Sequence, residues 1–131
     1  MARIMVCDED PEVLRLETAI LTKAGHEVVA CASGIAALKE LGVQPEDASV
    51  ALPDLLVLDI MMPVIDGYAV ASIMRNSPRT RALPILVVSA LAELRTSFAD
   101  SEVNGFMTKP FTPESLTSAV AKILARCKAQ A

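Results

Sequence analysis

Four charged residues stand directly after apolar, strand-like runs in this sequence, and together they could bind a metal ion and a phosphoryl group. The runs occupy residues 4–7, 55–58 and 105–108. The charged residues that follow them are Asp8 and Glu9, Asp59, and Lys109. A buried strand that ends on a charged residue directs that side chain out of the end of a sheet. Three acids and one lysine placed in this way indicate a site for a divalent cation and a phosphoryl group.

The chemistry open to such a site follows from the charges. Crowded carboxylates repel one another, and a hard dication such as Mg²⁺ relieves that repulsion by taking oxygen ligands. Asp59 could then act as a nucleophile and form an aspartyl phosphate. Lys109 would offer a positive charge to the phosphoryl oxygens, and Ser89 a hydroxyl donor. The new phosphate would add about -1.5 to -2 charge at a strand end, so nearby loops should rearrange.

The elements that must position these residues alternate along the chain between strand and helix. Strands are expected at residues 3–7, 27–31, 55–58, 85–88 and 105–107. Helices are expected from Pro11 to Gly25 and over residues 34–41, 66–75, 92–100 and 112–127. Asp10, Ser33 and Asp66 are expected as helix N-caps, because short polar side chains can accept a hydrogen bond from the first helical turn. This alternation predicts an α/β fold: a doubly wound, five-stranded parallel sheet with helices on both faces.

Such a sheet brings the charged residues together. In doubly wound sheets the ligand site lies outside the carboxyl ends of the strands, where the strand order reverses. Five residues fall at or just past a predicted strand end: Asp8, Glu9, Asp59, Ser89 and Lys109. They come from four separate segments, and this topology gathers them at one edge.

Composition excludes several other classes of protein. The 131 residues are 53% hydrophobic, which suits a single domain over residues 1–131 with one well-buried core. The net charge of -4, with no basic stripe, argues against direct nucleic-acid binding. No apolar run is long enough to span a bilayer, and no signal peptide is evident, so we expect a cytoplasmic protein. The cysteines, Cys7, Cys31 and Cys127, are widely spaced, and we expect them to be reduced.

The ordered motifs resemble a known family. The first strand with its acidic pair, the segment from Leu56 through Asp59 to Gly67, the Ser89-Ala90 pair and Lys109-Pro110 are together similar to the response-regulator receiver domain of two-component signalling. The resemblance covers nearly the whole chain and implies a CheY-like, flavodoxin-like fold with strand order 2-1-3-4-5.

The resemblance also implies roles for individual residues. Asp59 would accept a phosphoryl group from a histidine of a kinase or phosphotransfer protein. Asp8, Glu9, Asp59 and the main-chain carbonyl of Met61 would bind Mg²⁺, and Lys109 would assist the transfer. Ser89 and Phe106 would be the switch residues.

The implied protein is a signalling domain rather than an enzyme, with self-catalysed phosphoryl transfer and slow autodephosphorylation. A downstream protein target is implied, and a phosphorylation-dependent dimer is one form the output could take.

Three departures from the family pattern carry expectations of their own. Glu9 stands where the family usually has Asp, which would alter the geometry of metal binding. The connection over residues 42–52 is longer than usual, and the span from Ser89 to Lys109 is shorter, so we expect the helix over residues 92–100 to be short or displaced. Met61 and Leu91 flank the acceptor with apolar side chains that cannot position an attacking water, which predicts a long-lived aspartyl phosphate.

Two other functions compete with this one. A receiver-like interaction module that is never phosphorylated is the main alternative, and the presence of Asp59, Ser89 and Lys109 argues against it. A flavin binder would need a Ser/Thr/Gly-rich loop after the first strand, and a phosphohydrolase a second acid at position 61. No output domain is evident after the last helix, so we expect either a stand-alone regulator or a receiver cut from a longer protein.

Overall fold

The computed structural model describes residues 2–129 except 93, 95–97 and 99–101, and its centre is a five-stranded parallel sheet. The strands are β1 (Arg3–Cys7), β2 (Glu27–Cys31), β3 (Leu55–Leu58), β4 (Ile85–Ser89) and β5 (Gly105–Thr108). They lie in the order β2-β1-β3-β4-β5. The predicted doubly wound fold with strand order 2-1-3-4-5 is confirmed, and β4 and β5 each extend one residue beyond the predicted strand.

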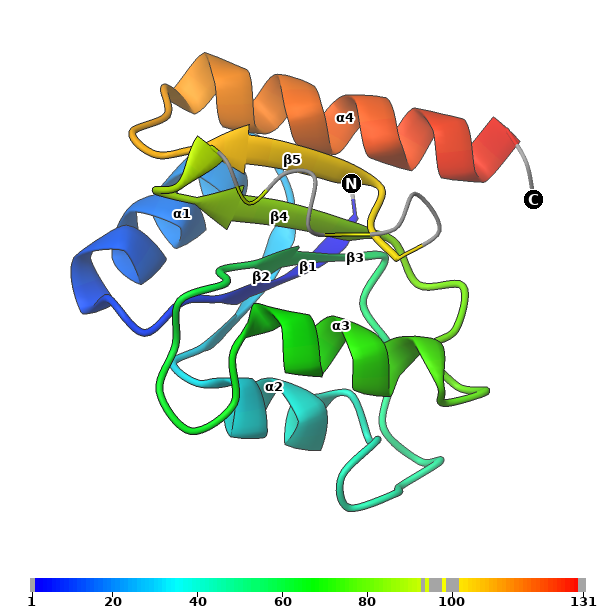
Figure 1. Cartoon of the computed structure of the whole chain (residues 1–131). Helices are drawn as coiled ribbons and strands as arrows, with labels where there is room; N and C mark the ends of the chain where they lie inside the picture. The colour runs from blue at the N-terminus through cyan, green and yellow to red at the C-terminus, as the bar shows by residue number, and fades with distance from the viewer. Residues whose placement is uncertain (1, 93, 95–97, 99–101, 130–131) are drawn as a thin grey trace.

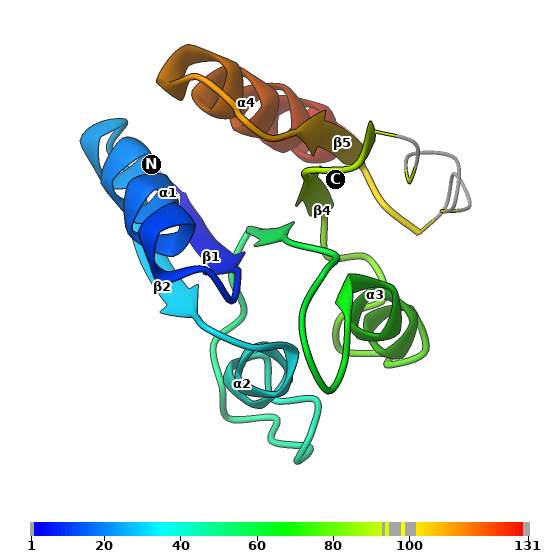
Figure 2. The same ribbon diagram turned by 60° about the vertical axis from the view of Figure 1, so that its left-hand side comes forward.

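Helices cover both faces of the sheet (Figure 1). One pair, α1 (Pro11–Lys23) and α4 (Pro113–Ala129), lies on one face, and the other pair, α2 (Gly34–Glu40) and α3 (Gly67–Arg75), lies on the opposite face (Figure 2). None of the helices in the described ranges is long and apolar enough to cross a bilayer.

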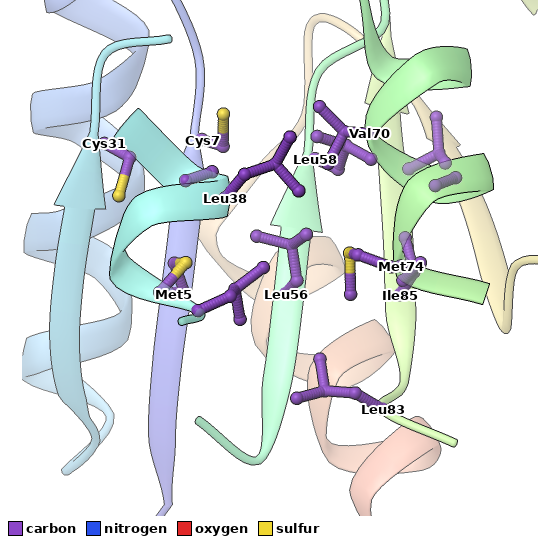
Figure 3. Packing of buried hydrophobic residues seen from close by; sticks show 14 of the residues in the cluster. Met5, Cys7, Cys31, Leu38, Leu56, Leu58, Val70, Met74, Leu83 and Ile85 are labelled. Atoms are coloured by element: carbon purple, nitrogen blue, oxygen red, sulfur yellow. The ribbon is translucent and has the colours of Figure 1, made fainter. Parts of the chain in front are cut away.

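Two apolar layers hold the helices on the sheet, and they draw on alternate residues of each strand. Ile4 and Val6 of β1 pack in the layer beneath α1 and α4, whereas Met5 and Cys7 pack in the layer beneath α2 and α3 (Figure 3). Successive side chains of a strand point to opposite faces, so a strand buried on both faces must be apolar throughout. The continuous apolar runs in the sequence are therefore a direct consequence of the two-layer burial.

Three side chains cap helices as predicted. The carboxylate oxygen Oδ1 of Asp10 accepts from the Glu12 N–H at 2.9 Å, and Oδ1 of Asp66 accepts from the Ala69 N–H at 2.9 Å. Ser33 Oγ likewise accepts a backbone N–H in the first turn of α2. Each cap fixes where the chain turns from a strand end into a helix, and thereby fixes the loops that border the site.

The connection between β4 and β5 contacts α3 through some of its described residues. The helix predicted over residues 92–100 lies largely outside the described residues. Within that range, the ring of the described residue Phe98 stacks on Tyr68 of α3, with centroids 4.7 Å apart. At the end of α3, the Arg75 guanidinium donates to the carbonyl oxygens of Glu102 and Leu83, at 3.0 and 2.8 Å. The Arg75 side chain therefore connects the segment that precedes β5 with the α3–β4 loop.

Candidate functional site

The carboxyl ends of the strands bring four of the predicted site residues to one edge of the sheet. Asp8 follows β1, Asp59 follows β3, Ser89 ends β4 and Lys109 follows β5. Backbone hydrogen bonds hold their positions across the edge: the Asp59 N–H donates to the Cys7 carbonyl at 3.0 Å, and the Lys109 N–H donates to the Ser89 carbonyl at 2.8 Å. The predicted convergence of these segments is present in the structure.

Lys109 joins the two buried carboxylates of the site. Its Nζ donates to Asp8 Oδ2 at 2.7 Å and to Asp59 Oδ1 at 3.3 Å. Asp8 is only 1% exposed and Asp59 only 5% exposed, so both acids lie at the floor of the site. Charge-assisted hydrogen bonds of this kind are stronger than neutral ones, and they position the ammonium beside the oxygen atoms of Asp59.

These charged groups shift one another's pKa values. Burial raises the pKa of Asp59, and the nearby Asp8 carboxylate raises it further, while Lys109 and the Ile60 N–H act to lower it. Burial alone would lower the pKa of Lys109, but its hydrogen bonds and charge interactions with Asp8 and Asp59 outweigh that effect and raise it. The lysine therefore stays charged, and the two acids repel each other in a poorly solvated space. A bound cation would relieve that repulsion.

The backbone around Asp59 leaves almost no space behind the acceptor. The Gly67 N–H donates to the Ile60 carbonyl at 2.8 Å, and a Cβ at Gly67 would come within 2.5 Å of the Asp59 carbonyl oxygen. Real Cβ atoms do not approach a carbonyl oxygen so closely. A glycine at the start of α3 is therefore required for the helix to pack directly on the acceptor segment.

The two predicted switch residues occupy different surroundings. Ser89 is fully buried, and its Oγ accepts from the Leu91 N–H at 3.2 Å, so this hydroxyl lies between the sheet and the β4–β5 connection. Phe106 is half-buried on β5 and packs against the apolar layer beneath α2 and α3. A switching role for either residue stays a prediction.

The predicted metal ligands are only partly gathered. Asp8 and Asp59 meet through Lys109, whereas the side chain of Glu9 is exposed. Within the described part of the chain, no three His, Cys, Asp or Glu side chains lie close enough to hold a metal ion. Mg²⁺ does not require three, because it commonly takes one or two carboxylates and keeps several waters. The pair of buried carboxylates therefore fits Mg²⁺, with Glu9 and the Met61 carbonyl as further predicted ligands.

One buried acid near the site was not anticipated from the sequence. Glu17 of α1 is 1% exposed, and its Oε1 has no hydrogen-bond partner. Its spacing did offer a signal, since Glu17 lies four residues after Val13 and four before Leu21, on the apolar face of an amphipathic helix. Burial raises its pKa to about 8, with a further contribution from Asp8.

Comparison with known proteins agrees with this geometry. The family model for the response regulator receiver domain matches residues 4–121. The DNA-binding dual master transcriptional regulator RpaA of Synechocystis sp. is 34% identical over 128 residues, which make up 96% of this chain and 50% of RpaA. The chain thus spans about half the length of curated relatives of this kind.

Solved structures agree as well. The response regulator TrrA of Thermotoga maritima, in complex with Mg²⁺ and BeF, superposes with a TM-score of 0.79 at 28% identity, covering 94% of this chain and 99% of TrrA. The chemotaxis response regulator CheY4 of Vibrio cholerae superposes with a TM-score of 0.82 at 26% identity, covering 94% of this chain and 98% of CheY4. The sheet order, the gathered strand-end residues and the match of the family model over most of the sequence lead to one conclusion: this chain belongs to the family of response regulator receiver domains of two-component signalling.

Proposed function

We propose that this chain accepts a phosphoryl group on Asp59 from a phosphorylated histidine of a kinase or phosphotransfer protein. The observation that carries the proposal is the Lys109 ammonium, which lies between two buried carboxylates at 2.7 and 3.3 Å. The carboxyl ends of the strands thus hold a nucleophile (Asp59), a positive charge (Lys109) and a second acid that could bind a cation (Asp8). Membership of the receiver family supports the same role.

The transfer uses groups already in place. A carboxylate oxygen of Asp59 attacks phosphorus, the bond from phosphorus to the imidazole nitrogen breaks, and its electron pair returns to the ring. Lys109 stabilises negative charge on the phosphoryl oxygens, and Ser89 offers its hydroxyl to one of them. Mg²⁺, held by Asp8 and Asp59, would neutralise charge on the same oxygens. Because each Asp59 accepts one group, the chain acts as a signalling domain rather than as an enzyme with turnover on a separate substrate.

The surface around the acceptor supports a protein as the phosphoryl donor. Asp59 lies at the floor of the site, so the donor must cover the surrounding residues to reach it. Met61 is 57% exposed and Val64 is 87% exposed, both in the loop directly after Asp59. Leu91 adds a third exposed apolar side chain on the opposite flank, beyond Ser89. Exposed apolar side chains grouped at a functional site are typical of protein interfaces.

The output of the phosphorylated state is a change in protein contacts. RpaA is a DNA-binding regulator, and this chain covers only half of it, so DNA binding is not carried over to these residues. We propose that phosphorylation alters the β4–β5 side of the sheet, because Ser89 lies at the carboxyl end of β4 and pairs with Thr108 of β5. A downstream protein, or a second phosphorylated copy, would bind there. We also propose a cytoplasmic location, consistent with the free cysteines Cys7, Cys31 and Cys127.

The test is the intact mass of the protein after incubation with Mg²⁺ and acetyl phosphate. The native chain should gain about 80 Da, the mass of one phosphoryl group, and Asp59→Asn should gain nothing. Asp54→Asn, at an exposed acid before β3, is the matched control and should gain the same mass as the native chain. Failure of the native chain to gain mass, together with failure to bind fluoroberyllate, would favour the interaction module that is never phosphorylated.

A further inference from the structure

The connection between β4 and β5 places one aromatic ring in the core. Among the described residues of this connection, which are 90–92, 94, 98 and 102–104, only Phe98 is buried, at 8% exposed. Its side chain packs in the apolar layer beneath α2 and α3, and its ring stacks on that of Tyr68 with an interplanar angle of 28°. Phe98 is therefore the described residue that anchors the middle of the connection.

The other ring of the stack belongs to the helix that packs on the acceptor. Tyr68 lies in the first turn of α3, directly after Gly67, whose N–H donates to the Ile60 carbonyl at 2.8 Å. Ile60 follows Asp59, and a Cβ at Gly67 would come within 2.5 Å of the Asp59 carbonyl oxygen. The start of α3 thus has almost no freedom relative to the acceptor, and the Tyr68 ring offers Phe98 a fixed partner.

The first turn of the connection is bound to the site from the other side. Ser89 Oγ accepts the Leu91 N–H at 3.2 Å, and the Leu91 carbonyl accepts the Leu94 N–H at 3.2 Å. Leu94 packs against the same apolar layer as Phe98. The connection is therefore held at two places that both lead back to the site, which are the Ser89 hydroxyl and the Tyr68 ring.

A phosphoryl group on Asp59 would act on these two places differently. In the proposed transfer, the Ser89 hydroxyl donates to a phosphoryl oxygen. A serine hydroxyl has one hydrogen and two lone pairs, so Oγ can donate there and still accept from Leu91. A shift of Oγ toward the phosphoryl group then draws the first turn of the connection with it, whereas the stack holds Phe98 on α3. The stack therefore opposes rearrangement of the connection.

We propose that the stack of Tyr68 on Phe98 is a latch, which holds the β4–β5 connection in its unphosphorylated arrangement until phosphorylation of Asp59 releases it. This inference rests on the proposed function and names the contact through which the site acts on the β4–β5 side of the sheet. An aromatic pair changes an equilibrium constant by about two- to tenfold beyond the effect of its buried area. Removal of one ring should therefore favour the released arrangement by about that factor and tighten the binding of a ligand that requires release.

Calorimetric titration of the full chain with fluoroberyllate in saturating Mg²⁺ tests the latch, with fluoroberyllate as the analogue of the phosphoryl group. The variants are Phe98→Leu and Tyr68→Leu, which keep an apolar side chain and remove one ring. Each should lower the Kd for fluoroberyllate by about two- to tenfold, and the double variant should lower it no further than a single one, because both remove the same contact. Ile73→Ala, later on the same helix and against the same apolar layer, is the control for lost packing and should change the Kd by less than about twofold.

A second measurement follows the Tyr68 ring itself. Tyr68 is the only tyrosine, and the chain has no tryptophan, so the tyrosine band of the near-ultraviolet circular dichroism spectrum reports on this ring alone. Saturating Mg²⁺ and fluoroberyllate should change that band in the native chain and in Ile73→Ala, because the stack is released. The same addition should leave the band of Phe98→Leu nearly unchanged, because no stack is left to release.

Two results would overturn the latch. One is a Kd for fluoroberyllate that is unchanged or raised in both leucine variants, and the other is a tyrosine band of the native chain that does not respond to loading. The proposed function stands in either case, provided the native chain still binds fluoroberyllate and gains a phosphoryl group. If the native chain does neither, the proposed function is wrong, and the latch is wrong with it.

Discussion

Replacing Glu17 with Gln should abolish a large part of the dependence of stability on pH. The unfolded chain releases the Glu17 proton near pH 4.5, whereas the folded chain holds it until about pH 8. The folded state therefore binds more protons in this window, and its stability falls as pH rises. Each pH unit removes about 1.4 kcal/mol, so about 3 kcal/mol of stability is lost between pH 4.5 and pH 7. A glutamine at this position cannot ionise, so the variant should not lose this stability as the pH rises.

Urea unfolding of both proteins between pH 5 and pH 8, followed by far-ultraviolet circular dichroism, measures this difference. The chain contains no tryptophan, so fluorescence is a poorer probe. At pH 5 the native chain and Glu17→Gln should differ by less than about 1 kcal/mol from this cause, and the gap should widen in favour of the variant to about 3 kcal/mol at pH 7. Asp59 has a pKa shifted in the same direction, but it is present in both proteins and its effect largely cancels. A gap that stays constant across this range would show that Glu17 ionises as freely in the folded chain as in the unfolded one.

Four further substitutions have expected outcomes. Val64 has a φ of 72°, which is unfavourable for a β-branched residue, so Val64→Asn should raise the free energy of unfolding in urea by about 1 kcal/mol. Gly67→Ala places a Cβ against the Asp59 carbonyl and should lower that free energy by about 2 kcal/mol or more, and it should slow phosphorylation by acetyl phosphate. Arg75→Met removes the donor shared by several backbone carbonyls and should cost about 3 kcal/mol in the same unfolding assay. Met61→Asn supplies a polar side chain beside the acceptor and should shorten the half-life of the phosphorylated protein measured by intact mass; an unchanged half-life would contradict the role assigned to Met61.

Local signals in the sequence predicted most of this fold, because the relevant interactions are themselves local. Strands buried on both faces must be apolar throughout, and caps such as Asp10 act on helical N–H groups only two residues away. The gathering of Asp59 and Lys109 was predictable for a different reason: in a parallel doubly wound sheet, all strand ends meet at one edge.

What could not be predicted depends on packing between distant segments. Asp8 and Glu9 are neighbours in the sequence, yet Asp8 is buried and Glu9 is exposed. The spacing of Glu17 suits the inner face of α1, but the burial of this acid was not predicted, and nothing in the sequence indicated that its Oε1 would lack a hydrogen-bond partner. Likewise, Arg75 is an ordinary basic residue at a helix end in the sequence, and only the folded chain shows that it donates to the carbonyl oxygens of residues 80, 81, 83 and 102. Such contacts join segments whose relative position is fixed only when the whole fold is formed.

The effects expected at Glu17 separate a functional residue from a mere defect in the core. A buried acid that serves no purpose should be replaceable with a gain in stability and no other consequence. Glu17→Leu should make the fold more stable at pH 7, because the unfolded native chain loses a Glu17 proton that the folded native chain retains. A cation bound at Asp8 would neutralise a charge that helps to keep Glu17 protonated. Saturating Mg²⁺ should therefore stabilise the native chain against urea more than it stabilises Glu17→Leu, and equal stabilisation of the two would show that a bound cation does not act on the Glu17 carboxyl group.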